Sequence, residues 1–205
     1  GNAPKDPTIR KLFNESGFYS FVRYTGAEPI VQNADTVQIV SGCESDNSLA
    51  RHICDFVMTK AGLSRAQCRF IYVMMVEMMA NVFKHAYNCN DVLYPRCFVK
   101  YLKEEGTVAF TFMDTGEGIP STVRRNFAEK LDLLKIKSEY KYVESALNGD
   151  FRTSTHEEHR GKGLPKIRKF CTNEKIQNMR IITSKADVSV LSKSYRSKDL
   201  EKPLI

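Results

Sequence analysis

The sequence predicts a mixed helix-and-strand (α+β) fold. Three observations support this class: short runs alternate between apolar and polar residues, two longer segments repeat apolar residues at helical spacing, and turns rich in Gly, Pro and Asn separate them. The chain has 205 residues, of which 42% are hydrophobic and 27% charged, so it can bury a sizeable core. The longest apolar stretch, residues 70–83, contains Glu77 and Asn81, and we therefore predict no membrane span.

Residues 1–35 are expected to form an amino-terminal arm or edge element beside a single domain at 36–205. Pro and Gly residues interrupt this segment, and with its short apolar stretch at 18–22 we expect either an arm or an edge strand there. The chain begins with neither a signal-peptide core nor an initiator Met, so we expect the processed start of a longer protein.

Two helices are predicted in the first half of the chain. Apolar residues recur at helical spacing from Leu49 to Val57, and Gly62 ends this helix. Residues 64–67 form a capping-box pattern, in which a Ser and a Gln three positions later satisfy the first backbone amides of a helix. This second helix should continue to about Tyr87.

Strands are predicted where apolar and polar residues alternate between turns. A further helix should begin at Gly161–Gly163, just before an apolar pattern of helical period. The segment 121–160 is polar and weakly periodic, which is typical of a lid or binding loop, with a short helix possible only at 127–134. The predicted strands are 36–40, 96–102, 107–113, 176–184 and 188–192, after which a polar, frayed tail runs to Ile205.

Charge and cysteine content narrow the classes of ligand and compartment. The formal charge is +7, and the basic excess at 121–175 suits a polyanion such as nucleotide phosphates or nucleic acid, although a solvated basic surface is equally compatible with it. Six Cys residues without a CxxC pair indicate reduced thiols and a cytoplasmic protein. His156 and His159 lie close together, but no third ligand accompanies them, which disfavours a metal site there.

Three polar residues of the second helix share one face. Glu77, Asn81 and His85 are four residues apart, so each lies only about 40° around the helix from the one before. The same turns are rich in Met and Val, and a carboxylate and an amide buried among them need partners. The three residues therefore form either a hydrogen-bonded network in the core or the polar floor of a site for a ligand or metal ion.

A glycine-containing turn follows the strand predicted at 107–113. Asp114 at the strand end can accept a hydrogen bond from an exocyclic amine, and Gly116 and Gly118 let a flat ring approach without a Cβ in the way. The pattern lacks the third glycine of a Rossmann fingerprint, and a plain turn is the alternative interpretation.

A second pair of glycines, Gly161 and Gly163, encloses Lys162 where the last helix should begin. Backbone amides and the positive end of the helix dipole make such a helix start a natural phosphate site. Arg152 and Arg160 would add positive charge. A loop that simply leads into a helix is the alternative.

Together, these three segments resemble the nucleotide-binding domain of the GHKL superfamily, the histidine kinase-like ATPases. Residues 77–86 look like its N box, 114–120 like its G1 box and 161–164 like its G2 box, and the likeness covers roughly 36–192. The resemblance implies the Bergerat fold, a two-layer α/β sandwich in which helices cover one face of a mixed sheet. It also implies a flexible ATP lid, here at about 121–160. The compact size is most similar to the kinase-like and anti-sigma-factor branches.

The resemblance further implies roles for individual residues. Glu77 stands where hydrolysing members have their general base, and Asn81 would hold the Mg²⁺ that bridges the phosphates. Asp114 would receive the adenine amine, with Thr183 or Ser184 completing the adenine pocket. The other residues expected to bind ATP are Lys84, His85, Gly116, Gly118, Ile119, Arg152, Arg160, Gly161, Lys162, Gly163 and Leu164.

Two departures from the superfamily pattern concern the lid and the type of kinase. Pro165 follows Leu164 where many members have a further glycine, which affects how a lid would close. His52 lacks the acidic residue and proline that usually follow a phosphoacceptor histidine, so a complete sensor kinase is disfavoured.

The expected function is Mg-ATP binding followed by hydrolysis, or by transfer of the γ-phosphate to a protein partner, with ordering of the lid as the signal. The partner would be another protein or further domains of a longer chain. The alternative is a nucleotide-gated interaction module without significant turnover. Nucleic-acid binding is a third and weaker interpretation, because the basic region shows no stacking aromatics and no recognition helix.

Overall fold

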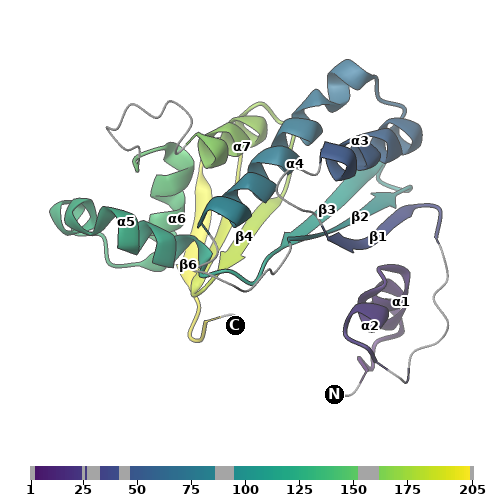
Figure 1. Cartoon of the computed structure of the whole chain (residues 1–205), viewed down its shortest axis with the longest axis horizontal. Coiled ribbons are helices and arrows are strands. Elements are labelled where there is room, and N and C mark those ends of the chain that lie inside the picture. The colour runs from purple at the N-terminus through teal and green to yellow at the C-terminus, as the bar shows by residue number, and fades with distance from the viewer. Residues whose placement is uncertain are drawn as a thin grey trace. The chain divides into compact units, whose positions relative to one another are not determined.

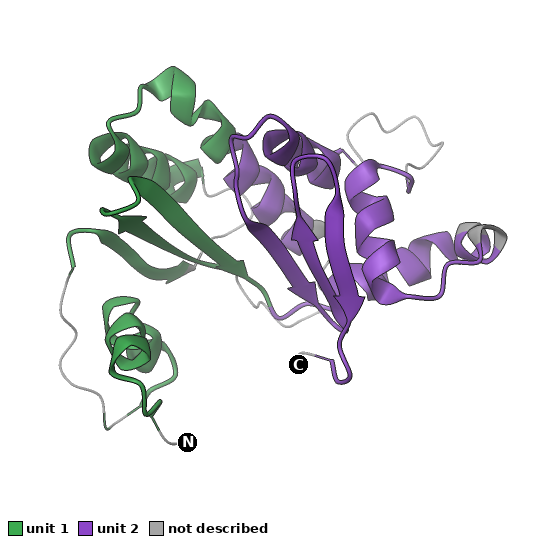
Figure 2. Ribbon diagram, turned by 180° about the vertical axis from the view of Figure 1, so that it is seen from behind, with its two compact units in different colours: residues 1–72, 94–114 green, residues 73–93, 115–205 purple. Residues whose placement is uncertain are grey.

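The computed structural model places the helices and strands in two compact units (Figures 1 and 2). Unit 1 comprises residues 1–72 and 94–114, and unit 2 comprises residues 73–93 and 115–205. Both units contain helices and strands, which confirms the α+β class. The domain boundary expected at residue 35 stays a prediction. The structure describes residues 3–24, 26, 33–41, 47–85, 95–151 and 162–203.

Unit 1 is built on a three-stranded antiparallel sheet in the order β1-β2-β3. The strands are β1 (Thr36–Ser41), β2 (Arg96–Leu102) and β3 (Thr107–Met113), all within one or two residues of the predicted ranges. Side chains alternate across β2, so that Cys97 and Val99 are buried on one face. Helix α3 (Asn47–Ala61) packs against β2 and β3, as the spacing of its apolar residues predicted.

Helix α4 (Arg65–His85) begins with the predicted capping box. The backbone amide of Gln67 donates to Ser64 Oγ at 3.3 Å, and the backbone amide of Ser64 donates to Gln67 Oε1 at 2.9 Å. Cys68 and Ile71 are buried in unit 1, and the helix continues into unit 2 after Tyr72. Among the described residues, no helix is both long and apolar enough to cross a membrane.

The amino-terminal segment is helical, so the edge strand expected at 18–22 is wrong. Helix α1 (Pro7–Glu15) is followed by the single turn α2 (Phe18–Phe21). The carboxylate of Asp6 caps α1 by accepting from the amides of Thr8 and Ile9 at 2.7 and 3.3 Å, and proline occupies the first helical position. The Asp-Pro pair is thus a helix-start signal that the sequence analysis missed. The apolar residues at 18–22 are held by ring contacts within the arm, such as Phe13–Phe18 at 4.6 Å between centroids.

Unit 2 contains a second three-stranded antiparallel sheet, in the order β4-β5-β6. Its strands are β4 (Met179–Thr183), β5 (Ala186–Val190) and β6 (Tyr195–Asp199). The frayed tail expected after residue 192 is wrong, because β6 pairs with β5 along its whole length. The residues of β6 are polar because most of their side chains are exposed. Helix α6 (Glu139–Asn148) packs on β5 and β6 and against α7 (Gly163–Thr172). The core of this unit is formed by Val143, Leu147, Cys171, Ala186, Val188 and Val190.

Two further features of the architecture differ from the prediction. The described strands form two antiparallel sheets rather than one mixed sheet. The segment expected to be a polar lid is largely helical, with α5 (Gly118–Leu134), kinked at Phe127, followed by α6. Although most residues of α6 are polar, one face of this helix is apolar, because Tyr142, Val143 and Leu147 recur at helical spacing and are buried. The remainder of the predicted lid, 152–160, lies outside the described residues.

The described cysteines are free thiols, as the sequence predicted. They are Cys54, Cys68, Cys97 and Cys171, whereas Cys43 and Cys89 lie outside the described residues. Burial raises the pKa of Cys97 to about 12 and that of Cys54 to about 11, so these thiols are protonated and unreactive near neutral pH.

Candidate functional site

Two polar side chains interrupt the buried surface of α4 within unit 2. Glu77 and Asn81 are one turn apart and only partly buried, whereas Met75 and Met79 of the same helix are almost fully buried. Because residues two positions apart point to nearly opposite sides of a helix, the carboxylate and the amide lie together on a face away from these methionines. The side chain of His85, which the pattern places one turn further on, lies outside the described residues.

The first turn of α7 lies directly against this polar pair. A Cβ on Gly163 would be 2.9 Å from Oε2 of Glu77 and 3.3 Å from both terminal amide atoms of Asn81. Gly163 is itself buried, and it is the first residue of the helix. Only glycine lets the backbone of α7 approach the two side chains this closely without displacing them. The structure therefore brings together two of the three sequence segments selected above, although they are about 80 residues apart in the chain.

A lysine that the sequence analysis did not select completes this cluster. The Lys166 ammonium donates a hydrogen bond to Oε1 of Glu77, and the two groups form an ion pair. The Lys166 side chain is 49% exposed and that of Glu77 is 22% exposed. Lys166 follows Gly163 by three residues, so both lie on the same side of α7. Lys166 could have been identified from the sequence, because it lies three residues after Gly163 in the first turn of a helix expected to bind phosphate.

The amino-terminal end of α7 has the properties of an anion site. Lys162 is the N-cap residue, and within the described part of the chain no side chain caps the helix there. The first backbone amides of a helix lack partners inside it, and the helix dipole is positive at this end. Lys166 adds positive charge near this end of the helix, and the helix contains no acidic residue. The exposed Lys162 and the first turn of α7 can therefore attract phosphate groups.

The glycine turn predicted to lie against the base contacts the end of β4. Gly118 has φ +79°, and a Cβ on it would lie 2.6 Å from Thr183 Oγ1. The amide of Ile119 donates to the same oxygen at 3.2 Å. Both the backbone conformation and the close contact require glycine at position 118. Thr183, selected on weak grounds from the sequence, is thus a direct neighbour of the turn.

The turn between β4 and β5 is held by a carboxylate from α6. Glu139 accepts hydrogen bonds from the Lys185 amide and from Arg124, each at 2.9 Å. Burial by itself would raise the pKa of Glu139, but hydrogen bonds from Lys185, Ser184 and Arg124 outweigh it and lower the pKa. The ionised carboxylate therefore stabilises the turn that follows Thr183.

Other selected residues have structural roles or fall outside this cluster. Ile119 and Leu164 are partly buried and pack against the core of unit 2. Asp114 is the last residue of unit 1, and its predicted contact with an adenine amine stays a prediction, as does the role of Gly116. Several residues predicted to bind ATP lie outside the described residues: Arg152, Arg160 and Gly161, together with the side chains of Lys84 and His85.

Glu77 and Asn81 could bind a hard cation such as Mg²⁺ only if a bound ligand, such as a phosphate, supplies further oxygen atoms. Their oxygen atoms are the kind of donor that Mg²⁺ prefers, and both face the start of α7. Among the described residues, no group of three or more His, Cys, Asp or Glu side chains could hold a metal ion by itself. This donor set fits the usual binding of Mg²⁺ through one or two protein oxygens plus phosphates and water.

Comparison of the chain with protein-family models, with curated proteins and with solved structures found no match.

Proposed function

We propose that unit 2 binds Mg-ATP at the junction of α4 and α7, and that the chain hydrolyses ATP or transfers its γ-phosphate to a protein partner. The observation that carries this proposal is the contact of Gly163 with Glu77 and Asn81. An anion-attracting helix start, a candidate metal ligand and a candidate general base meet at one place, and each belongs to a segment with the residues of a GHKL motif. The contact of Gly118 with Thr183 adds support on the nucleoside side. The proposed compartment is the cytoplasm, where ATP and reduced thiols are both available.

In the proposed complex, the first-turn amides of α7 and the ammonium groups of Lys162 and Lys166 bind the phosphates. The amide oxygen of Asn81 would hold Mg²⁺, and a bound Mg²⁺ would neutralise charge on the phosphates. The turn at Gly118 and the hydroxyl of Thr183 lie against the base. Asp114 is proposed to accept a hydrogen bond from the adenine amine, and this role is supported only by the resemblance to the GHKL superfamily.

Glu77 acts as the general base in the hydrolytic reaction. Its carboxylate accepts a proton from the attacking water, whose oxygen forms a bond to the γ-phosphorus while the bond to the bridging oxygen of ADP breaks. The products are ADP and inorganic phosphate. In phosphoryl transfer, a hydroxyl or imidazole of the partner replaces the water. For either reaction Lys166 must exchange the Glu77 carboxylate for the γ-phosphate, which frees the base as the substrate binds.

The ion pair between Lys166 and Glu77 also favours the alternative function, a nucleotide-gated interaction module with negligible turnover. If Lys166 keeps its contact with the carboxylate after ATP binds, Glu77 is not available to accept a proton. ATP binding would then change the conformation of the chain without being followed by chemistry.

Two measurements test the proposal and separate its two forms. Isothermal titration with ATP and ADP, with and without Mg²⁺, measures binding to the wild-type chain and to Asn81→Ala, which should weaken Mg-ATP. Single-turnover assays with γ-labelled ATP then compare wild type with Glu77→Ala. Phosphate release or transfer that Glu77→Ala abolishes supports the enzyme. Equal binding without chemistry in both proteins supports the gated module, and absence of Mg-ATP binding to wild type refutes both.

A further inference from the structure

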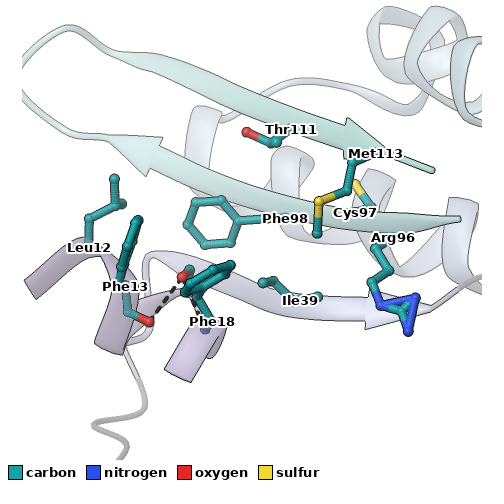
Figure 3. Close-up of a pocket in the computed structure, with 10 residues that line it drawn as sticks. Leu12, Phe13, Phe18, Ile39, Arg96, Cys97, Phe98, Thr111 and Met113 are labelled. Carbon is teal, nitrogen blue, oxygen red and sulfur yellow. Dashed lines mark hydrogen bonds between the residues drawn. The ribbon is translucent and has the colours of Figure 1, made fainter. Parts of the chain in front are cut away.

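The sheets of the two units differ in what lies on their second face. In unit 1, Phe13 and Phe18 of the arm and Phe98 of β2 line the space between the arm and the sheet (Figure 3). In unit 2, side chains of α6 and α7 pack with Val188 and Val190 on one face of the sheet. Figure 2 shows the opposite face, with the helices of unit 2 behind or beside the strands. We name it the outer face, and its side chains belong to Arg180, Ile182, Asp187, Ser189, Arg196 and Lys198.

Three cations of the outer face extend into solvent. Arg180 on β4 and Arg196 on β6 lie on either side of Ser189 in one cross-strand row, and Lys198 lies two residues further along β6. The side chains of Arg180 and Lys198 are 58% and 70% exposed, and Arg196 is exposed as well. Among the described residues, no hydrogen bond or ion pair engages the Arg196 guanidinium. Its donors are therefore available to a ligand.

Asp187 lies on the same face, but its charge is already balanced. Nε and Nη2 of Arg180 donate to its two carboxylate oxygens at 2.8 and 2.9 Å, and the Lys198 ammonium is 4.0 Å from one of them. The hydrogen bonds from Arg180 lower the pKa of Asp187, so the carboxylate is ionised and orients the guanidinium. Because the Asp187 side chain is only 7% exposed, the cations reach further into solvent than the acid, and a ligand meets positive charge.

The segment that contains this sheet is basic as a whole. Residues 162–203 contain 11 Lys and Arg against 4 Asp and Glu, an excess equal to the formal net charge of +7 of the entire chain. An excess of one sign attracts oppositely charged ligands over roughly 8–10 Å at moderate salt concentrations. The ligand that suits the outer face is therefore anionic.

The composition of the outer face favours an acidic protein segment over a nucleic acid. Proteins that bind single-stranded nucleic acid stack its bases on aromatic side chains, and the six residues of the outer face include none. Three cations are also few beside the roughly 6–10 phosphate contacts of a typical nucleic-acid interface. Ile182 is 43% exposed on the same face, and an apolar side chain of a peptide can cover it, whereas a phosphate backbone cannot.

The spacing of the cations indicates how such a segment would lie. Residues two apart in a strand project from the same face about 6.5–7 Å from each other, and Arg196 and Lys198 have this relation. An extended peptide has the same spacing between its own alternate side chains, so acidic residues at positions i and i+2 can pair with both cations. The residue between them points the other way, towards β4, where Ile182 lies in the same cross-strand row as Lys198.

We propose that the outer face binds an extended acidic segment of a partner protein, with two acidic residues that flank an apolar one. The acidic side chains pair with Arg196 and Lys198, and the apolar side chain contacts Ile182. This site lies on the face of the sheet opposite the core contacts of α7, and it does not depend on nucleotide binding.

The test uses the full chain labelled with ¹⁵N and the peptide acetyl-Ser-Glu-Val-Glu-Ser-amide, followed by amide chemical shifts at low ionic strength. We expect saturable shifts in β5 and β6 that weaken as salt is added. The neutral peptide with Gln in place of both Glu should bind about fivefold more weakly, because both charge pairs are lost. A peptide of the same composition with the order Val-Glu-Glu loses the alternate spacing, and it should also bind more weakly.

Variants test the location of the site. The double variant Arg196→Gln with Lys198→Gln should bind the acidic peptide about fivefold more weakly and the neutral peptide within about twofold of wild type. The matched control replaces Lys137 and Lys141, two exposed lysines near the start of α6, with Gln. It removes the same charge from another part of unit 2 and should leave binding of the acidic peptide within about twofold of wild type.

Four outcomes would overturn the proposal: equal binding of the acidic and neutral peptides, equal binding of the two peptide orders, unchanged binding by the folded double variant, or shifts in α7 instead of β5 and β6. Tighter binding of a short thymidine oligonucleotide to β5 and β6 would also refute it, in favour of a nucleic-acid surface. Should the double variant fail to fold, the peptide comparisons and the location of the shifts in wild type still decide the question.

Discussion

Replacing Gly163 with alanine should disable the proposed site while leaving the fold intact. The new Cβ would lie 2.9 Å from Glu77 Oε2 and 3.3 Å from the Asn81 amide atoms, so both side chains must move. These are the ends of flexible side chains, and moving them by a few tenths of an ångström costs the protein little. The effect should therefore appear in nucleotide affinity and only weakly in stability.

The magnitudes follow from three contributions. Alanine is favoured over glycine within a helix by about 0.5–1 kcal/mol, and less at its first position. Disturbing the half-exposed ion pair of Glu77 and Lys166 costs about 0–1 kcal/mol. The free energy of unfolding of Gly163→Ala should thus stay within about 1 kcal/mol of wild type. Displacing the oxygens proposed to hold Mg²⁺ and water would remove charge-assisted contacts worth about 1.5–3 kcal/mol each, which predicts at least a tenfold loss of Mg-ATP affinity.

Gly106→Ala provides the matched control. Gly106 has φ +60° in the turn between β2 and β3, and a Cβ there would meet nothing within 4 Å. Alanine in that left-handed conformation should cost about 1–2 kcal/mol of stability and leave Mg-ATP binding unchanged. Denaturant unfolding followed by circular dichroism and titration calorimetry measure the two properties. Wild-type Mg-ATP affinity in folded Gly163→Ala would refute the role assigned to the contact of α4 with α7.

Three further changes have different expected signatures. Gly118→Ala should cost about 2–3 kcal/mol in denaturant unfolding, because it combines an unfavourable φ of +79° with a Cβ placed 2.6 Å from Thr183 Oγ1, and Thr183→Ala in the same chain should recover part of the loss. Lys166→Met should change stability by less than about 1 kcal/mol, since the ion pair is half exposed, but weaken Mg-ATP by roughly tenfold in calorimetry. Glu139→Gln should lower stability at neutral pH, and its deficit relative to wild type should shrink as the pH falls below the pKa of an unfolded glutamate, about 4.3.

The sign of the pH effect follows from the lowered pKa of Glu139. A carboxylate whose pKa is lower in the folded than in the unfolded chain contributes its stability above the unfolded value, near pH 4.3, and loses it as the pH falls through the folded value. A deficit of Glu139→Gln that grows towards low pH would contradict this. If Lys166→Met binds Mg-ATP as tightly as wild type, Lys166 pairs with Glu77 but does not bind the phosphates. A cost for Gly118→Ala no larger than that of Gly106→Ala would contradict the close contact with Thr183.

Much of the secondary structure could be predicted from patterns between residues that are close in the sequence. The capping box at Ser64 placed the start of α4 because the bonds that cap a helix join residues three positions apart. Alternation placed β2 and β3, and the apolar period placed α3. The edge strand expected at 18–22 was wrong because a short apolar stretch suits a strand or a helical turn equally well, and the ring contact of Phe18 with Phe13 forms only in the folded arm.

The α+β class, the ends of elements with local caps, and the selection of Glu77, Asn81 and Gly163 all follow from the amino-acid sequence. Three features appear only in the folded chain: the described strands form two antiparallel sheets, Gly163 lies against the other two residues, and Lys166 pairs with Glu77 across 89 positions. The difference is one of range along the chain. Capping and periodicity act within a few residues and leave their mark on neighbouring letters, whereas an ion pair or a steric contact between distant segments depends on packing that no single stretch of sequence records.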